Sequence, residues 1–368
     1  MNRILTFAVF IIIACSIYFF MHFFIFKVLV KNLPLTTKWV RFVKYFFIFS
    51  GLSFPLSMMF SRLLKFHLLN YYSFVWLGII AIAFFIFLLV WVTLKFLPGF
   101  GKIASITALI LVAIISAYSL YNGLRLPVVK KITLSLQNLP KDLDGFSIIH
   151  LSDLHLEPFK SKKAIKAIVA SVRAIKPDLI VITGDLIEDD ISNDNHFITE
   201  LKKLTAVYGV FAVTGNHEFY AGIDNFYTLA EKTNITILRN QTVEVANHLQ
   251  IIGLDDDDGR RFSSDGPLLE PLIESCDQTK PIILLYHRPT GFDRAVEKGV
   301  DLQLSGHSHA GQIPPMDILV HVVYKYPSGL YKKNGAYINT SPGAGYWGPP
   351  MRFLNRAEIT HIILKSKE

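Results

Sequence analysis

Acidic residues are missing from the first 141 residues of this 368-residue chain, because no aspartate or glutamate precedes Asp142. Residues 1–131 carry 13 lysines and arginines, which leaves 24 cations against all 29 acids in the remainder. The formal net charge of +8 therefore comes from the first part of the chain, and the second part has a balance of −5 (24 − 29). This distribution excludes a nucleic-acid footprint, and no nucleic-acid binding is expected.

Cysteine is scarce as well, since Cys15 and Cys276 are the only two in the sequence. Cys15 lies inside a long apolar stretch and Cys276 lies in the second half of the chain. This arrangement excludes a disulfide framework within either part. The sequence also lacks internal repeats and low-complexity tracts.

Four apolar stretches in the basic first part are close to the roughly 20 residues that a helix needs to cross a bilayer. They run from Ile4 to Phe26, Phe46 to Leu64, Phe74 to Leu97 and Ala104 to Leu124. The second stretch is the weakest because Pro55 and several serines lower its hydropathy, and a re-entrant or interfacial segment is its alternative. We expect a transmembrane region of about four helices over residues 1–126, in contact with the lipid bilayer.

The cations near the span ends predict an orientation. Seven lie near the first and third connections, and six lie near the opposite ends of the spans. Because cytoplasmic loops are enriched in Lys and Arg, we expect a multi-pass protein of the cell membrane whose second half is extracytoplasmic. Loss of the second span would reverse this orientation.

Residues 127–145 read as a juxtamembrane linker and a first strand, and residues 146–368 read as a globular domain. Nine short apolar strands are expected, at Phe146–Leu151, Leu179–Thr183, Val210–Thr214, Ile235–Leu238, Leu249–Leu254, Ile282–Tyr286, Leu302–Ser305, Tyr337–Asn339 and Ile359–Leu364. Helical patterns lie between them, at Lys162–Ile175, Asn195–Leu204, Asp224–Lys232, Pro267–Cys276 and Gly291–Lys298. The alternation indicates an α/β fold, and the clustered later strands favour a four-layer α/β/β/α sandwich.

Five motifs in the second half each end an apolar run with side chains that can bind metal. They are Asp153-Leu154-His155, Gly184-Asp185, Gly215-Asn216-His217-Glu218, His287 and Gly306-His307-Ser308-His309. Carboxylate, imidazole and amide ligands without thiolate suit hard or borderline divalent ions, which activate water or polarise a phosphoryl oxygen. Alone, most of these motifs are better explained by a turn residue or a core histidine, and Gly215–Glu218 is the strongest of them. Five motifs at successive strand ends nevertheless indicate one metal site.

The spacing within the motifs agrees with this hypothesis. Residues i and i+2 of an extended segment point the same way, so Asp153 and His155 can reach one ion. His217 could donate a proton, while Glu218 could hold the second ring nitrogen of His217 and raise its pKa. Arg288 is a candidate for contact with a substrate phosphate, and an ordinary surface arginine is the alternative.

In this order the motifs resemble the calcineurin-like metallophosphoesterase family, whose signature runs D-x-H, G-D, G-N-H-[DE], H and G-H-x-H. The resemblance covers about Phe146 to Leu364. The stretch His307–Gln312 is similar to that of a membrane-associated bacterial branch, as is the later run from Gly345 to Ile359. Ala310 departs from the glycine that this branch usually has.

The resemblance implies two divalent ions, of Mn, Fe or Zn, about 4 Å apart. The implied ligands are Asp153, His155, Asp185 and His309 for the first ion, and Asp185, Asn216, His287 and His307 for the second. A hydroxide bridging the ions would attack phosphorus in line, and His217 would stabilise the transition state or protonate the leaving oxygen. The implied protein is a membrane-anchored phosphodiesterase or phosphomonoesterase. Its substrate is a phosphate ester, and a lipid- or nucleotide-linked ester is one alternative.

Two other functions stay open. A pyrophosphohydrolase acting on a lipid-linked nucleotide sugar, such as a UDP-acyl-glucosamine, would suit an enzyme tethered at a bilayer. A membrane sensor or scaffold would bind metal without turnover, although the intact Asn216-His217-Glu218 argues against it. Asp255–Asp258 lacks the spacing of a calcium loop and is expected to be a solvated turn at the pocket rim. Tyr346 and Trp347 could line an apolar or base-stacking subsite or could simply pack their loop.

Overall fold

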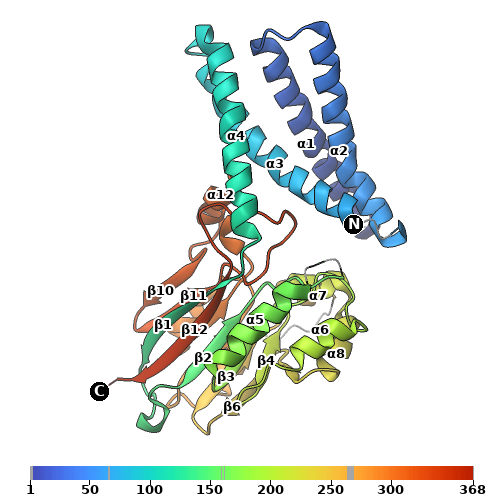
Figure 1. Cartoon of the computed structure of the whole chain (residues 1–368). Helices are drawn as coiled ribbons and strands as arrows, with labels where there is room; N and C mark the ends of the chain where they lie inside the picture. Colours follow the sequence, from blue (N-terminus) through green and yellow to red (C-terminus); the bar gives the residue numbers. More distant parts are fainter. Residues whose placement is uncertain (1–2, 65–66, 159, 161, 263–268, 368) are drawn as a thin grey trace. The chain divides into compact units, whose positions relative to one another are not determined.

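The structure is a computed structural model that describes residues 3–64, 67–158, 160, 162–262 and 269–367, and they form two compact units (Figure 1). The first unit contains Met1–Leu124 together with two short later segments, Ile313–Met316 and Gly348–Leu354. The second unit contains the rest of the chain. The two later segments of the first unit were not anticipated, because no sequence pattern distinguishes them from the loops around them.

Four long helices make up most of the first unit. They are α1 (Arg3–Asn32), α2 (Thr37–Leu64), α3 (His67–Thr93) and α4 (Gly101–Gly123). Each contains between 22 and 26 residues that are apolar enough to cross a membrane. The prediction of four such helices is confirmed, and the second is one continuous helix that includes Pro55.

The segment Gly348–Leu354 is packed tightly within the first unit. Met351 is fully buried in an apolar cluster with residues of α3 and α4. A Cβ added at Gly78 would lie 2.4 Å from the sulfur of Met351, and one added at Gly123 would lie 2.5 Å from the carbonyl oxygen of Pro350. Gly123 therefore admits the backbone of this segment, and Gly78 admits the side chain of Met351.

The second unit contains two six-stranded sheets. The first sheet has the order β1-β12-β2-β3-β4-β5. Its strands are β1 (Val128–Leu136), β2 (Ser147–Leu151), β3 (Leu179–Thr183), β4 (Val210–Val213), β5 (Ile235–Ile237) and β12 (Glu358–Ser366). β2 to β5 are mutually parallel, so their carboxyl ends meet at one edge of the sheet.

The second sheet has the order β10-β11-β9-β8-β7-β6. Its strands are β6 (Gln241–Val245), β7 (Leu249–Gly253), β8 (Ile282–Leu285), β9 (Leu302–Ser305), β10 (Gly329–Lys333) and β11 (Ala336–Thr340). β7, β8, β9 and β11 run parallel, and the two outer strands run antiparallel to their neighbours. This sheet therefore also gathers several strand ends at one edge.

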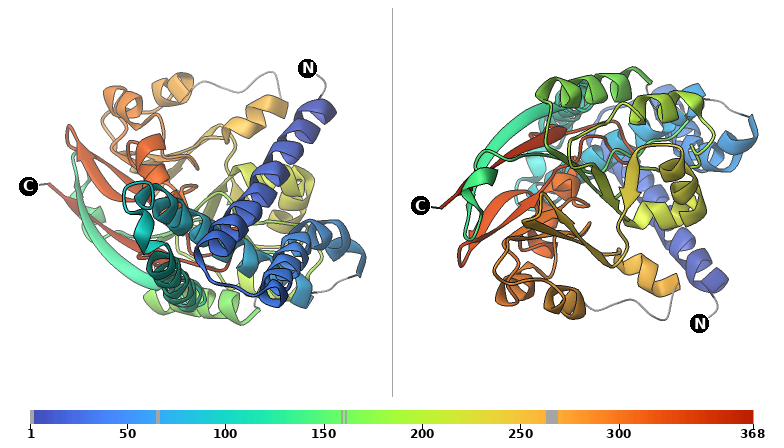
Figure 2. Two further views of the ribbon diagram at one scale, coloured as in Figure 1. Left: turned by 90° about the horizontal axis from the view of Figure 1, so that it is seen from above. Right: turned by 90° about the horizontal axis from the view of Figure 1, so that it is seen from below.

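Apolar side chains alternate between two cores along each central strand. Val181 of β3 points into the core between the sheets, whereas its neighbours Ile180 and Ile182 pack toward the helices. Ile283 and Leu284 of β8 divide in the same way. The outer faces are covered by helices α5 (Lys162–Ile175), α6 (Asn195–Leu201) and α8 (Ile223–Glu231) on one side and α10 (Leu269–Glu274) and α11 (Phe292–Glu297) on the other (Figure 2). The predicted α/β sandwich is confirmed.

Several short elements were not expected from the sequence. They are β6, β10, α7 (Asn216–Ala221), α9 (Asp257–Phe262) and α12 (Met316–Val323). β6 and β10 are edge strands whose residues are mostly exposed or half-buried, and they lack the apolar run that marks a buried strand. The three helices have six to eight residues, too few for a helical periodicity to be recognised.

Candidate metal centre

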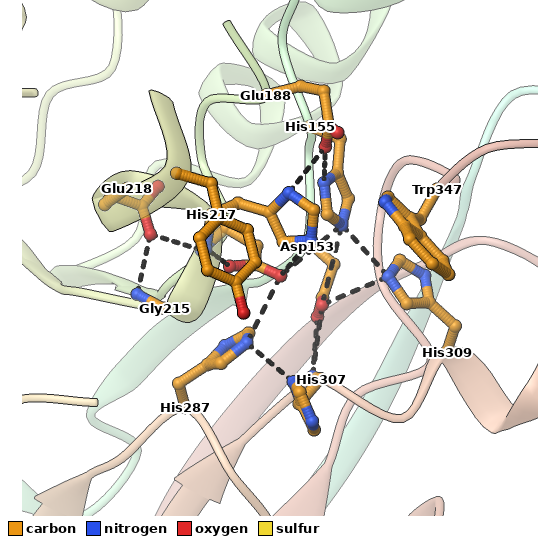
Figure 3. Close-up of polar contacts among 12 residues, drawn as sticks. Asp153, His155, Glu188, Gly215, His217, Glu218, His287, His307, His309 and Trp347 are labelled. Carbon is orange, nitrogen blue, oxygen red and sulfur yellow. Dashed lines mark hydrogen bonds and ion pairs between the residues drawn. The ribbon is translucent and has the colours of Figure 1, made fainter. Parts of the chain in front are cut away.

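The side chains of the five motifs lie together at the carboxyl ends of strands from both sheets (Figure 3). Among the residues that the structure describes, three groups of side chains could each hold a metal ion, because the potential ligand atoms within each group lie within 4.8 Å of one another. The groups are Asp153, His155 and His309; His155, Asp185 and His217; and Asp185, His287 and His307. Asp185 belongs to two groups, so its carboxylate lies between the others.

The backbone at these positions adopts an unusual conformation. Five of the candidate ligands have φ between 46° and 69°, in the left-handed region that residues other than glycine rarely adopt. They are Asp153, His155, Asp185, His307 and His309. Such residues are held in place by the surrounding structure and gather at functional sites. The turns after β2, β3 and β9 therefore present ligands in a geometry that regular secondary structure does not provide.

In the first group, nitrogen and oxygen atoms converge on one point. The Nε2 atoms of His155 and His309 are 3.0 Å apart, and His309 Nε2 lies 3.3 Å from Asp153 Oδ1. Ser152 Oγ and the backbone N–H of His307 both donate to the Asp153 carboxylate. These contacts hold the carboxylate in place while its oxygen faces the imidazole nitrogens.

The third group, formed by Asp185, His287 and His307, is arranged in the same way around Asp185. His287 Nε2 lies 3.2 Å from Asp185 Oδ2 and 3.1 Å from His307 Nδ1. The nearby Oδ1 of Asn216 is buried and accepts no hydrogen bond from the residues that the structure describes. A buried amide oxygen without a donor is costly, and a cation is a partner that would satisfy it. The donor set and this oxygen therefore fit a divalent ion.

Hydrogen bonds to the outer ring nitrogens orient two of the histidines. His287 Nδ1 lies 2.8 Å from the Thr183 carbonyl oxygen, to which it donates, and this contact turns Nε2 toward Asp185. His155 Nδ1 lies 2.6 Å from Glu188 Oε2, and the other ring nitrogen of His155, Nε2, faces His309. Carboxylates and carbonyls that hold the outer nitrogen are typical of metal-binding histidines.

The charges around Asp185 favour its ionised form. Burial alone would raise the pKa of this carboxyl, but His287, His155 and His217 reverse the effect and hold the pKa well below its usual range. The backbone N–H of His217 also donates to Asp185 Oδ1 at 3.0 Å. Asp185 is therefore anionic.

His217 pairs with Glu188, a residue that the sequence did not single out. Its Nδ1 lies 2.9 Å from Glu188 Oε2, the oxygen that also binds His155. Burial lowers the pKa of His217, but Glu188 and Asp185 raise it above its ordinary value. His217 is thus favoured in the protonated form. The signal that the sequence offers is the acidic run Glu188-Asp189-Asp190, which begins three residues after Asp185.

The expected pairing of Glu218 with His217 is wrong. The Glu218 carboxylate instead accepts the backbone N–H groups of Gly215, Asp185, Leu186 and Ile187 at 2.6 to 3.1 Å. Glu218 lies in the first turn of α7 and reaches back to the residue before the helix, as capping glutamates do. Its role is to fix the two turns that carry Asp185 and Asn216.

The expectation of a solvated turn at Asp255–Asp258 is also wrong. Asp255, Asp256 and Asp258 are buried, with at most 4% of each residue exposed. The guanidinium of Arg288 forms a fork on Asp256, with both distances at 2.8 Å, and reaches Asp258 at 3.3 Å. Arg288 follows His287 directly and keeps 21% of its side chain exposed. The acidic run therefore holds an arginine beside the site.

Three aromatic rings lie against the histidines of the site. The ring of Trp347 is 5.9 Å from that of His217, and Tyr220 lies 5.2 Å from the same ring. Tyr324 stands edge-on to His307 at 5.9 Å. Trp347 is 53% exposed, so its ring is available to a bound molecule.

The model of the calcineurin-like phosphoesterase family matches residues 146–311 of the chain. An uncharacterized metallophosphoesterase of Campylobacter jejuni is 31% identical, over 99% of this chain and 100% of its own length. A transmembrane protein with metallophosphoesterase domain of Danio rerio is 33% identical over 71% of this chain and 62% of that protein. An uncharacterized metallophosphoesterase of Helicobacter pylori is 36% identical over 67% of this chain and 66% of that protein.

This chain thus covers slightly less than two thirds of the length of the last two relatives. Among solved structures, a dimetal phosphatase from Danio rerio aligns with a TM-score of 0.36 and 14% identity, over 55% of this chain and 88% of that chain. Because the likeness to the Campylobacter jejuni protein extends along the whole chain, and the matched family region contains the strand-end motifs, the chain belongs to the calcineurin-like metallophosphoesterase family.

Proposed function

We propose that the protein is a membrane-anchored phosphoesterase with two divalent metal ions. The observation that carries this proposal is the position of Asp185, whose carboxylate lies between His155 on one side and His287 with His307 on the other. Two clusters of nitrogen and oxygen atoms that share one anionic side chain suit two cations a few ångströms apart.

Asp153, His155, Asp185 and His309 would hold one ion, and Asp185, Asn216, His287 and His307 would hold the other. Ions of Mn, Fe or Zn bound there would supply a nucleophile from water and neutralise the charge on the phosphoryl oxygens. In the reaction, the oxygen of water bonds to phosphorus, the ester P–O bond breaks, and the leaving oxygen takes a proton. His217, held by Glu188, would provide that proton, and Arg288 would contact the phosphate.

Hydrolysis of a soluble aryl phosphodiester, measured together with metal content, tests the proposal. The purified chain, loaded with Mn²⁺, Fe²⁺ or Zn²⁺ in turn, should bind about two ions and release nitrophenol from bis(p-nitrophenyl) phosphate. Asp185→Ala and His307→Ala should lose turnover. Asp301→Ala and His361→Ala, which replace the same residue types away from the cluster, should retain it. Unchanged turnover in the first pair would refute the assignment.

A pyrophosphohydrolase acting on a lipid-linked nucleotide sugar is the second candidate, and the exposed ring of Trp347 beside His217 favours it. An indole at this place could stack on a base or a sugar. Incubation with a UDP-acyl-glucosamine would release UMP if this candidate is right, and Trp347→Ala would then raise KM. A protein that binds two metals but turns over neither substrate would be a sensor or scaffold.

We also propose that the catalytic unit is extracytoplasmic. The five cations around the turn between α1 and α2 support this orientation, since they favour the cytoplasmic side. Protease added to intact cells should then cleave the second unit, and protection until the membrane is broken would reverse the orientation.

A further inference from the structure

Helix α12 exposes an apolar face that nothing in the proposed reaction uses. Ile318 and Val322 are 55% and 80% exposed, and Leu319 and Val323 are 45% and 69% exposed. Each pair is four residues apart and so shares one side of the helix. Asp317 and His321, also four residues apart, form a separate polar side. The helix is therefore amphipathic, with its apolar side unburied.

The chain enters α12 directly from the first unit. The segment Ile313–Met316 belongs to that unit, and Met316 is the first residue of α12. Gln312, the last residue before the segment, binds the backbone of Trp347 through both ends of its amide, at 2.8 and 2.9 Å. Trp347 is in turn the last residue before Gly348–Leu354, the other segment of the first unit. One side chain thus joins the residues that directly precede the two later segments of the first unit.

The other end of α12 leads to the metal centre. The backbone N–H of Tyr324 donates to the Val320 carbonyl, which continues the hydrogen bonding of the helix by one residue. The Tyr324 ring then stands edge-on to His307. Five residues thus separate the start of the exposed apolar side from a side chain in contact with a candidate metal ligand.

We propose that α12 lies in the bilayer surface with Ile318, Leu319, Val322 and Val323 in the lipid, and that the site takes the phosphate ester of a membrane lipid. An amphipathic helix with an apolar side and a polar side lies in the plane of a membrane interface. Eight residues bury too little area to hold a soluble protein there, but the four long helices keep α12 at the bilayer. The substrate class rests on the proposed phosphoesterase function, whereas the position of α12 does not.

A second copy of the chain is the competing occupant of this face. A stable dimer needs about 800 Å² from each partner, which a helix of eight residues does not offer by itself. Continuity with the membrane-anchored unit therefore favours lipid.

The position of α12 is tested with a nitroxide spin label. Val322→Cys and Val207→Cys, each in a background with Cys15→Ala and Cys276→Ala, are labelled in the full chain in lipid nanodiscs. The two valines are 80% and 79% exposed, and Val207 precedes β4, away from the strand ends that form the site. Collisions of the Val322→Cys label with oxygen should be frequent and those with a water-soluble nickel chelate rare, and the Val207→Cys label should show the reverse. Equal access of the nickel chelate to both labels would overturn the position.

The substrate class is tested with the double substitution Val322→Gln and Val323→Gln, against Val207→Gln as the matched control. Glutamine keeps the helix favourable and removes the apolar surface without adding charge. Phosphatidic acid and phosphatidylglycerol are supplied with two butyryl or two oleoyl chains, beside the aryl diester. The double substitution should lower turnover of the oleoyl lipids by about tenfold or more and leave the butyryl lipids and the aryl diester unchanged.

The outcomes separate the two proposals. If every metal-ligand variant still hydrolyses the aryl diester, the phosphoesterase function is refuted, while the spin-label result stands. The lipid substrate is refuted if the chain hydrolyses the aryl diester but neither oleoyl lipid. It is also refuted if the double substitution lowers turnover of the oleoyl and butyryl lipids equally.

Discussion

Replacement of Glu188 by glutamine tests the proton donor of the proposed reaction. One oxygen of this carboxylate lies 2.6 Å from His155 Nδ1 and 2.9 Å from His217 Nδ1. Burial would raise the pKa of Glu188, but its hydrogen bonds to the two histidines lower it to about 2, so the group is anionic at neutral pH. Glutamine keeps the shape and one accepting oxygen and removes the charge that favours protonated His217.

The expected loss in kcat is about 10- to 100-fold, the range found when a carboxylate behind a functional histidine is removed. General acid catalysis contributes about 10²- to 10⁴-fold to the rate, so a larger loss in kcat would require that His217 no longer acts at all. The pKa of His217 should also fall, because Glu188 is one of the charges that raise it. A group that must be protonated to act loses activity above its pKa, so the alkaline limb of the kcat profile should move to lower pH.

The assay is hydrolysis of bis(p-nitrophenyl) phosphate across pH, with bound metal measured on the same samples. Glu157→Gln is the matched control, since Glu157 lies nearby but binds neither histidine. If Glu188 acts through His217, the Glu188→Gln change should cost little in a His217→Ala background. Full additivity of the two losses, or an unmoved pH profile at unchanged metal content, would refute the role given to Glu188.

Three further changes have defined outcomes. Gly123→Ala should lower the melting temperature of the detergent-solubilised chain, because the new Cβ meets the backbone at Pro350, whereas Gly99→Ala meets nothing within 4 Å and should not. Arg288→Ala removes the cation that pairs with the buried carboxylates of Asp256 and Asp258, so it should destabilise the chain by about 3–5 kcal/mol in urea unfolding. A loss no larger than that from replacing an exposed surface arginine would contradict the pairing. Burial raises the pKa of Asp301 to about 6, so its ionised form opposes folding and stability falls as pH rises from about 4 to 6. Asp301→Asn should therefore raise the melting temperature more at pH 8 than at pH 4, and an equal rise at both would contradict it.

Most of the sandwich could be predicted because its central strands are buried on both sides. A strand between two cores needs apolar residues at every position, as in Leu179–Thr183, and such runs stand out in any sequence. The long periodic helix Lys162–Ile175 was equally visible and has the predicted bounds. Edge strands such as β6 expose most of their polar residues, and nothing in their composition separates them from loops.

The candidate ligands could be predicted because each closes a recognisable strand, but their supporting residues could not. Glu188 and Thr183 touch the histidines through one oxygen each, and any loop acid or any carbonyl could do the same. Glu218 was placed on the wrong partner for the same reason. Its position after His217 suggested contact with that neighbour, whereas the first turn of a helix directs the side chain back to the N-terminal backbone.

The docking of Gly348–Leu354 within the helical unit was beyond sequence reasoning, because it depends on small residues that have no periodic signal. Gly78 and Gly123 read as ordinary glycines in apolar helices. However, Gly123 admits the backbone, and Gly78 the side chains, of a loop more than 200 residues away in the chain. The Arg352 backbone then completes the contact, since its N–H donates to the Ser119 carbonyl and its own carbonyl accepts from Asn122. These two hydrogen bonds tie the segment to the backbone and a side chain of α4, which makes it part of the helical unit rather than a loop resting on it.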